Sequence, residues 1–158
     1  MKIRVGLGMD THSLVKGRPF IIGGIAIPYT LGCDGHSDAD VLIHAICDAL
    51  LGAANLRDIG YHFPDTDHQY KDIDSKILLQ KTNHLITSLG WKIENIDATI
   101  ILEQPKLSPF VPAMQACISL ILGLPVEDIS IKAKTSEKMG FIGRGEGVSA
   151  TVVVLLQK

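Results

Sequence analysis

Residues 2–9 alternate between apolar residues and residues that are basic or glycine. A period of two is typical of a β-strand, whose successive side chains point to opposite faces. The pattern therefore predicts a strand with one apolar face that delivers Asp10 and His12 at its end. The apolar residues that share this face are Ile3, Val5, Leu7 and Met9.

A helical pattern begins near residue 40. Ser37 stands three residues before Asp40, an arrangement that resembles a capping box and predicts the start of a helix. Asp40, His44 and Asp48 recur every four residues and form one polar stripe on this helix. Two interpretations stay open: a solvated stripe, or a metal-binding His44 with a carboxylate behind it. The apolar residues at helical spacing are Val41, Leu42, Ala45, Ile46, Ala49, Leu50 and Ala53.

Two more helices are predicted over residues 74–89 and 110–122, and a glycine follows each one, as is common after helix ends. The first of them begins at Asp74 or Ser75. Its inward residues are expected to be Ile77, Leu78, Leu85, Ile86 and Leu89.

The remaining strand signals complete the predicted fold. Residues 20–28 predict a hairpin that turns at Gly23 and Gly24. Further strands are expected over 96–102, 129–134 and 148–156, with loops over 103–109 and 135–147. The helices are long enough for crossovers between strands. We therefore expect a single α/β domain over residues 1–158, of two-layer α+β type, with a mixed sheet covered by three helices plus a small hairpin.

Composition narrows the function classes. The chain has 158 residues, of which 46% are hydrophobic and 20% charged, as in globular proteins. A net charge of −2 argues against nucleic-acid binding and means that local cations or metal ions must meet any polyanionic ligand. No apolar run is long enough for a membrane span, and no targeting segment is recognisable, so a cytoplasmic location is expected. The three cysteines do not form a disulfide framework.

The candidate chemistry is that of a metal centre. Asp10 and His12 share a face of the first strand and can converge on one ion, although such a pair taken alone is more often part of a surface loop. With His44 they make an Asp-His-His donor set, which leaves zinc a fourth position for catalysis. The acidic segment over residues 56–67 is either solvated surface or a binder of metals and sugar hydroxyls.

Six motifs taken together resemble one enzyme family. They are D-T-H at 10–12, H-S-D-A-D at 36–40, H-A-I-C-D-A-L-L-G-A-A at 44–54, D-I-G at 58–60, F-P-D-T-D at 63–67 and T-S-E-K-M-G-F-I-G-R-G-E-G at 135–147. In order and spacing, along the whole chain, they resemble the 2-C-methyl-D-erythritol 2,4-cyclodiphosphate synthase family. The resemblance implies a bacterial, cytoplasmic phosphorus–oxygen lyase of non-mevalonate isoprenoid biosynthesis. Such an enzyme cyclises 4-diphosphocytidyl-2-C-methyl-D-erythritol 2-phosphate, releases CMP and works as a homotrimer with active sites between subunits.

The resemblance also implies roles for individual residues. Asp10, His12 and His44 hold Zn²⁺, Glu137 holds Mg²⁺ or Mn²⁺ on the substrate diphosphate, and His36 and Thr135 stabilise the transition state. The implied substrate-binding residues are Asp10, Thr11, His12, His36, Ser37, Asp58, Ile59, Gly60, Phe63, Pro64, Asp65, Thr66, Asp67, Leu102, Glu103, Gln104, Pro105, Lys106, Leu107, Ser108, Lys134, Thr135, Ser136, Glu137, Phe141 and Arg144.

Some positions depart from the family pattern or leave alternatives open. Leu102 and Ser108 lie in the implied cytosine pocket, where backbone groups read the base, and Lys134 replaces a hydroxyl residue. Lys134 either adds a phosphate contact or points to solvent. Arg144 and Glu146 either form a turn with a salt bridge or line a cavity at the trimer axis that accepts an isoprenoid diphosphate.

Overall fold

The computed structural model describes residues 1–158 and confirms the predicted fold class. The strands are β1 (Ile3–Val15), β2 (Phe20–Ile22), β3 (Ile25–Ile27), β4 (Gly32–Cys33), β5 (Lys92–Ile101), β6 (Ile129–Lys134) and β7 (Gly147–Gln157). The helices are α1 (Val41–Ala53), α2 (Ile59–His62), α3 (Ser75–Ser88), α4 (Val111–Leu122) and α5 (Gly140–Gly143), with 3₁₀ turns at His68–Tyr70, Ser108–Phe110 and Val126–Asp128.

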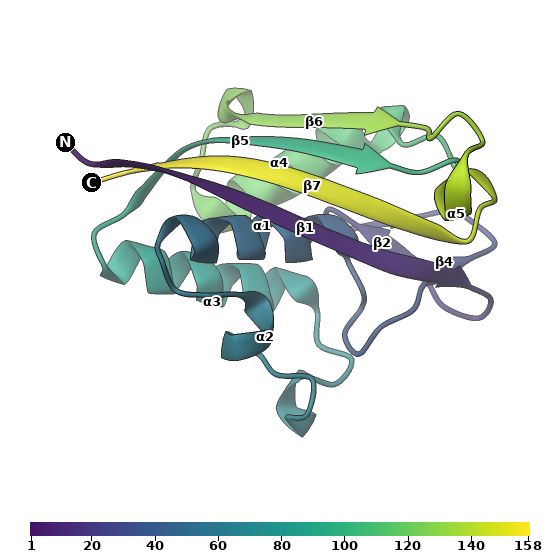
Figure 1. Ribbon diagram of the computed structural model, residues 1–158, viewed down its shortest axis with the longest axis horizontal. Helices are drawn as coiled ribbons and strands as arrows, with labels where there is room; N and C mark the ends of the chain where they lie inside the picture. The colour runs from purple at the N-terminus through teal and green to yellow at the C-terminus, as the bar shows by residue number, and fades with distance from the viewer.

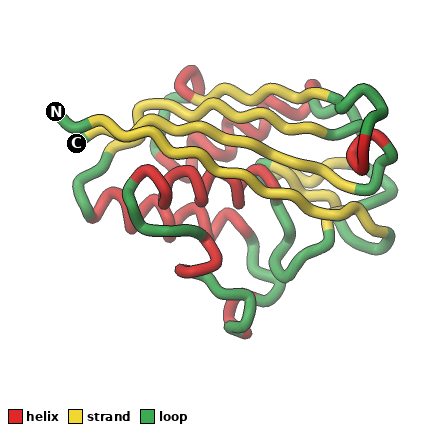
Figure 2. The backbone as a smooth tube through the Cα atoms, in the orientation of Figure 1, coloured by secondary structure: helices red, strands yellow, loops and turns green.

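The main sheet is mixed and has helices on one side only. Its strand order is β4-β1-β7-β5-β6, in which β5 and β6 are parallel and the other neighbours antiparallel. Helices α1, α3 and α4 form the second layer (Figures 1 and 2). The core lies between the layers, where every second residue of β7 from Val148 to Leu156 is buried. The predicted hairpin is confirmed as the separate two-stranded sheet of β2 and β3.

Strand β1 is longer than predicted and presents its apolar face outward. It continues through the positions of Asp10 and His12 to Val15, so these two residues lie within the strand. The face that carries Leu7 is exposed, whereas Gly6 and Gly8 face α1 and are buried. A Cβ on Gly8 would lie 1.9 Å from the backbone oxygen of Ala45, so only glycine allows this approach of strand and helix.

We expect Gly8→Ala to destabilise the metal-free protein by about 3 kcal/mol, the upper end of the usual range for overpacking, because a rigid helix backbone cannot move away from the new methyl group. Gly52→Ala is the matched control, since Gly52 lies in α1 and a methyl group on it would have no neighbour within 4 Å. Alanine there should raise stability by up to about 1 kcal/mol through helix propensity. Urea denaturation measures both changes, and equal stabilities of the two variants would contradict the close approach.

Several local predictions are wrong in instructive ways. In α3, Ile77 and Leu89 are exposed and Leu79 is buried instead, because the buried face is rotated relative to the predicted one. The short elements β4 and α2 fall in segments for which no helix or strand was predicted, and α5 falls in the predicted loop over 135–147; no periodicity extends over enough residues there to show. None of the helices has the length and apolar character that crossing a membrane would require.

Candidate metal centre and adjoining cavities

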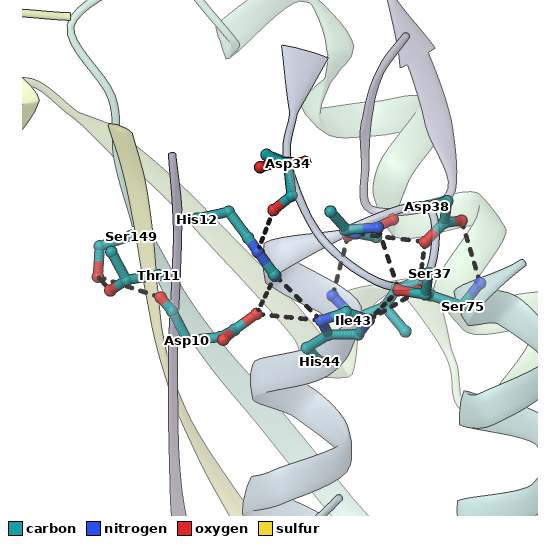
Figure 3. Close-up of polar contacts among 12 residues, drawn as sticks. Asp10, Thr11, His12, Asp34, Ser37, Asp38, Ile43, His44, Ser75 and Ser149 are labelled. Atoms are coloured by element: carbon teal, nitrogen blue, oxygen red, sulfur yellow. Dashed lines mark hydrogen bonds and ion pairs between the residues drawn. The ribbon is translucent and has the colours of Figure 1, made fainter. Parts of the chain in front are cut away.

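Three side chains converge where β1 crosses the first turn of α1 (Figure 3). Asp10 and His12 come from one face of β1, and His44 comes from α1. Asp10 Oδ2 lies 2.8 Å from His12 Nε2 and 3.1 Å from His44 Nδ1, and the two nitrogens are 3.2 Å apart. The predicted convergence of these residues is confirmed, and the surface-loop interpretation of Asp10 and His12 is wrong.

This triangle fits a metal ion. Donors of a tetrahedral zinc site lie about 2.1 Å from the ion and therefore about 3.4 Å from one another, close to the three observed separations. His12 Nδ1 donates to the backbone oxygen of Asp34 at 2.9 Å, so a neutral His12 has its lone pair on Nε2, facing the triangle. One oxygen and two imidazole nitrogens are donors that Zn²⁺ and other transition ions accept.

Electrostatics keep the carboxylate ready to act as a ligand. Burial raises the pKa of Asp10, but hydrogen bonds from the protonated rings of His12 and His44 and the attraction to their positive charge outweigh burial and hold the pKa at about 2. Burial lowers the pKa of His12, and its pairing with Asp10 outweighs this and raises the pKa above its usual value. Asp10 is thus ionised at neutral pH, whereas the raised pKa of His12 means that a metal ion must displace a proton from this ring as the pH falls.

The acidic neighbours of His44 on α1 are not ligands. Asp40, rather than the predicted Ser37, is the N-cap of α1: its carboxylate accepts from Ile43 N at 3.0 Å. It also accepts from the backbone nitrogens of the β2–β3 turn at 2.9 and 2.7 Å, and it is fully buried. Asp48 accepts from Ile59 N at 2.7 Å and so anchors α2. The interpretation of the stripe as solvated surface is therefore wrong, and only His44 of the stripe reaches the triangle.

Sequence reasoning did not identify Ser37 and Ser75 as the hydrogen-bond partners of His44. Its Nε2 contacts the hydroxyls of Ser37 and Ser75, at 3.1 and 2.9 Å, instead of a carboxylate. The sequence indicates Ser75 only as a possible helix cap, and that role belongs to Asp74, which accepts from Lys76 N. No short-range signal links Ser75 to a histidine that is 31 positions away.

A first cavity of about 350 Å³ opens beside the triangle. Its lining residues are His12, His36, Ser37, His44, Ile59, Gly60, Phe63, Asp65, Tyr70, Ile73 and Leu78. Seven of the predicted substrate-binding residues thus lie together. Next to them is an apolar wall that sequence reasoning did not identify, formed by Tyr70, Ile73 and Leu78.

Several predicted neighbours of this cavity make other contacts. Asp58 caps α2 by accepting from Tyr61 N, and Asp67 caps the following 3₁₀ turn by accepting from Gln69 N. Thr11 faces away from the triangle and donates to Ser149 Oγ at 3.1 Å (Figure 3). Pro64 and Thr66 do not line the cavity.

A second cavity of about 230 Å³ lies between the ends of β5 and β6. It is lined by Leu102, Glu103, Pro105, Lys106, Leu107, Ser108, Ala133, Lys134 and Thr135, all of them predicted except Ala133. Gln104 and Ser136 flank it, and Ser136 N donates to Glu103 at 3.3 Å. Glu137 is exposed and lines neither cavity; its backbone N–H bonds Thr135 Oγ1 at 3.3 Å.

The two cavities share no residue, so one chain divides the predicted substrate-binding residues between two places. Phe141 and Arg144 lie beyond both cavities. Phe141 belongs to α5, and Arg144 forms an exposed ion pair with Glu146 at 2.8 Å. That pair lowers the pKa of Glu146 and raises that of Arg144 through their mutual hydrogen bond and charge.

Comparison with known proteins finds relatives along the whole chain. The model of the YgbB family matches residues 3–157. A protein of Bacteroides thetaiotaomicron named 2-C-methyl-D-erythritol 2,4-cyclodiphosphate synthase is 60% identical over 158 residues, which are 100% of this chain and 99% of that protein.

Solved structures are similar as well. A structure of 2C-methyl-D-erythritol-2,4-cyclodiphosphate synthase in a CDP-bound form superposes with a TM-score of 0.90 at 38% identity, covering 98% of this chain and 100% of the other. The bifunctional IspDF from Campylobacter jejuni gives a TM-score of 0.94 at 42% identity. That match covers 98% of this chain and 42% of the longer one.

Proposed function

This chain belongs to the YgbB family, and from that premise we propose that it catalyses the reaction for which its relatives are named. The substrate is 4-diphosphocytidyl-2-C-methyl-D-erythritol 2-phosphate, and the products are 2-C-methyl-D-erythritol 2,4-cyclodiphosphate and CMP. By class this is a phosphorus–oxygen lyase, active in the non-mevalonate route to isoprenoid precursors. The observation that carries the proposal is the Asp10–His12–His44 triangle, two of whose residues, His12 and His44, line the first cavity.

The reaction needs charge neutralisation more than it needs a protein nucleophile. An oxygen of the 2-phosphate attacks the β-phosphorus, and the bond from that phosphorus to the oxygen bridging it to the α-phosphate breaks, so CMP leaves. Because both reacting groups are anions and the chain carries a net charge of −2, bound cations must offset their repulsion. A Zn²⁺ ion held by Asp10, His12 and His44 would supply positive charge and polarise a phosphoryl oxygen.

The chain's own residues orient the two phosphates. In the first cavity, His36 and Ser37 meet the reacting groups, and the apolar wall together with Gly60 holds the erythritol part. Because attacking and leaving groups belong to one molecule, correct orientation supplies much of the rate. Glu137 would hold Mg²⁺ or Mn²⁺, which would neutralise charge on the diphosphate, and Thr135, which lines the second cavity, would be the second transition-state stabiliser.

The second cavity is the proposed cytosine pocket. Leu102 and Leu107 line it with buried apolar side chains that cannot hydrogen-bond a base, and we propose that backbone groups of the same segment read the base edge. Lys134 lines this cavity and is exposed, so it can reach a phosphate of the nucleotide.

The uncovered face of the sheet supports a homotrimer. On β1, Val5, Leu7 and Met9 are 66%, 60% and 60% exposed, and Val153 beside Leu7 on β7 is 42% exposed. A contiguous apolar strand face on a chain of this size is typical of a subunit interface. We propose that three copies pack these faces together and that each active site joins the first cavity of one subunit to the second cavity of its neighbour. Arg144 and Glu146 would then line an axial cavity for an isoprenoid diphosphate.

Product analysis tests the proposed function. The purified protein is incubated with the substrate, Zn²⁺ and Mg²⁺, and phosphorus NMR follows the products. We expect a cyclic diphosphate and CMP in equal amounts, with both absent after chelation of the metals. Release of inorganic phosphate would instead indicate a metal-dependent phosphohydrolase, and no turnover would indicate a binding module.

A further inference from the structure

The imidazole ring of His44 has hydrogen-bond partners on the side that faces away from the triangle. Its Nδ1 faces Asp10 and His12, and its Nε2 points the other way, toward the start of α3 (Figure 3). There Nε2 lies 2.9 Å from Ser75 Oγ, and Ser75 is completely buried. The ring is therefore fixed between the triangle and a hydroxyl that solvent does not reach.

The hydrogen bonds of Ser75 decide which way the proton points. Its hydroxyl donates to Asp38 Oδ1, and its backbone N–H donates to Asp38 Oδ2 at 3.0 Å. A serine hydroxyl has one hydrogen, so Ser75 Oγ can meet His44 only as an acceptor. A neutral His44 must then carry its single ring hydrogen on Nε2 and present a lone pair on Nδ1 to the triangle.

Ser37 does not determine the tautomer of His44. Its Oγ lies 3.1 Å from His44 Nε2, but it also accepts from Ala39 N at 3.1 Å and lines the first cavity. Since Nε2 carries a hydrogen, the Ser37 hydroxyl cannot donate to it. The hydrogen of Ser37 is left for a ligand in the cavity, so the two serines have different tasks.

We propose that Ser75 and Asp38 are positioning residues that fix the tautomer and ring orientation of His44 for metal binding. Asp38 acts through Ser75, and neither residue touches the ion. The inference rests on the metal centre proposed above. It is independent of the cyclisation reaction, because metal affinity is measured without substrate. The rival explanation is that Asp38 and Ser75 only fasten the loop before α1 to the start of α3.

Co²⁺ binding to the metal-free full-length chain separates the two explanations. Ser75→Ala is expected to weaken Co²⁺ affinity about 10- to 100-fold, the usual effect of losing a hydrogen-bond partner of a metal-bound histidine. The matched control is Thr82→Val, which removes another fully buried hydroxyl of α3, one that makes no hydrogen bond to Asp10, His12 or His44. The control should bind Co²⁺ as the parent does. If Ser75→Ala lost thermal stability but kept parental affinity, the fastening role would stand and the proposal would fall.

Two further measurements keep the proposal testable if Ser75→Ala folds poorly. Asp38→Ala frees the Ser75 hydroxyl to donate to Nε2, so it should weaken Co²⁺ binding in the same direction. The variant that combines Ser75→Ala with Asp38→Ala should bind Co²⁺ no more weakly than Ser75→Ala alone. If the two losses of binding free energy added up instead, Asp38 would not act through Ser75.

The tautomer can also be observed directly. Nitrogen NMR of the metal-free parent, above the titration range of imidazole, should show the hydrogen of His44 on Nε2. In Asp38→Ala it should move toward Nδ1, where Asp10 can accept it. An unchanged tautomer would overturn the proposal. A parent chain that binds no Co²⁺ would overturn the metal centre as well.

Discussion

Replacing His44 with alanine is expected to abolish metal binding and CMP release together while the chain stays folded. The substitution leaves two donors, Asp10 and His12, which are too few for a tight site. Alanine is the best helix former, and the His44 side chain is 13% exposed at the edge of a cavity, so α1 should persist. Because Lewis-acid assistance contributes several kcal/mol, the rate should fall at least about 1000-fold.

The measurement is metal content by mass spectrometry alongside CMP release. The matched control is His84→Ala, which removes an exposed histidine of α3 that belongs to no cluster of metal-binding groups. It should keep both metal and activity. Parental CMP release by a metal-depleted His44→Ala protein would show that the triangle is not the catalytic centre.

Replacing Leu7 with aspartate is expected to dissociate the proposed trimer and to abolish activity. Leu7 is 60% exposed and pairs with Val153, so it lies within the apolar face of the sheet. Packing that face would bury one unpaired charge per subunit, at a cost of the order of several kcal/mol each. A lone subunit has both cavities, but they share no residue. A substrate bound to it would therefore contact either the second cavity with its base or the metal centre with its phosphates, but not both.

Light scattering after gel filtration reports the mass, and metal content is measured on the same sample. Leu120→Asp is the control, because Leu120 is 86% exposed on α4, on the helical side of the sheet. It should remain trimeric and active. An active monomer of Leu7→Asp would refute the shared active site, and an inactive trimer would place the defect elsewhere than in assembly.

The metal triangle could be predicted because its parts are encoded locally. Asp10 and His12 share a face through the period of a strand, and His44 lies early in a strongly periodic helix. The family motifs then indicated that these distant segments meet. Nothing in the periodicity of either segment says so, because that contact depends on Gly8 letting β1 approach α1.

The sequence by itself therefore determined the types of the long helices and strands and the mixed two-layer architecture, since side-chain periodicity is a local property. Its family motifs indicated the three donors, which periodicity alone left undecided. The tertiary structure alone decided which face of β1 is covered by helices. Either the face with Gly6 and Gly8 or the face with Leu7 could have been buried, and only the packing against α1 selects the glycine face. It also decided that Asp40 rather than Ser37 caps α1, because the buried carboxylate must serve α1 and the hairpin turn together. The contact of Ser75 with His44 has the same origin: a hydrogen bond over 31 positions exists only once the chain is folded.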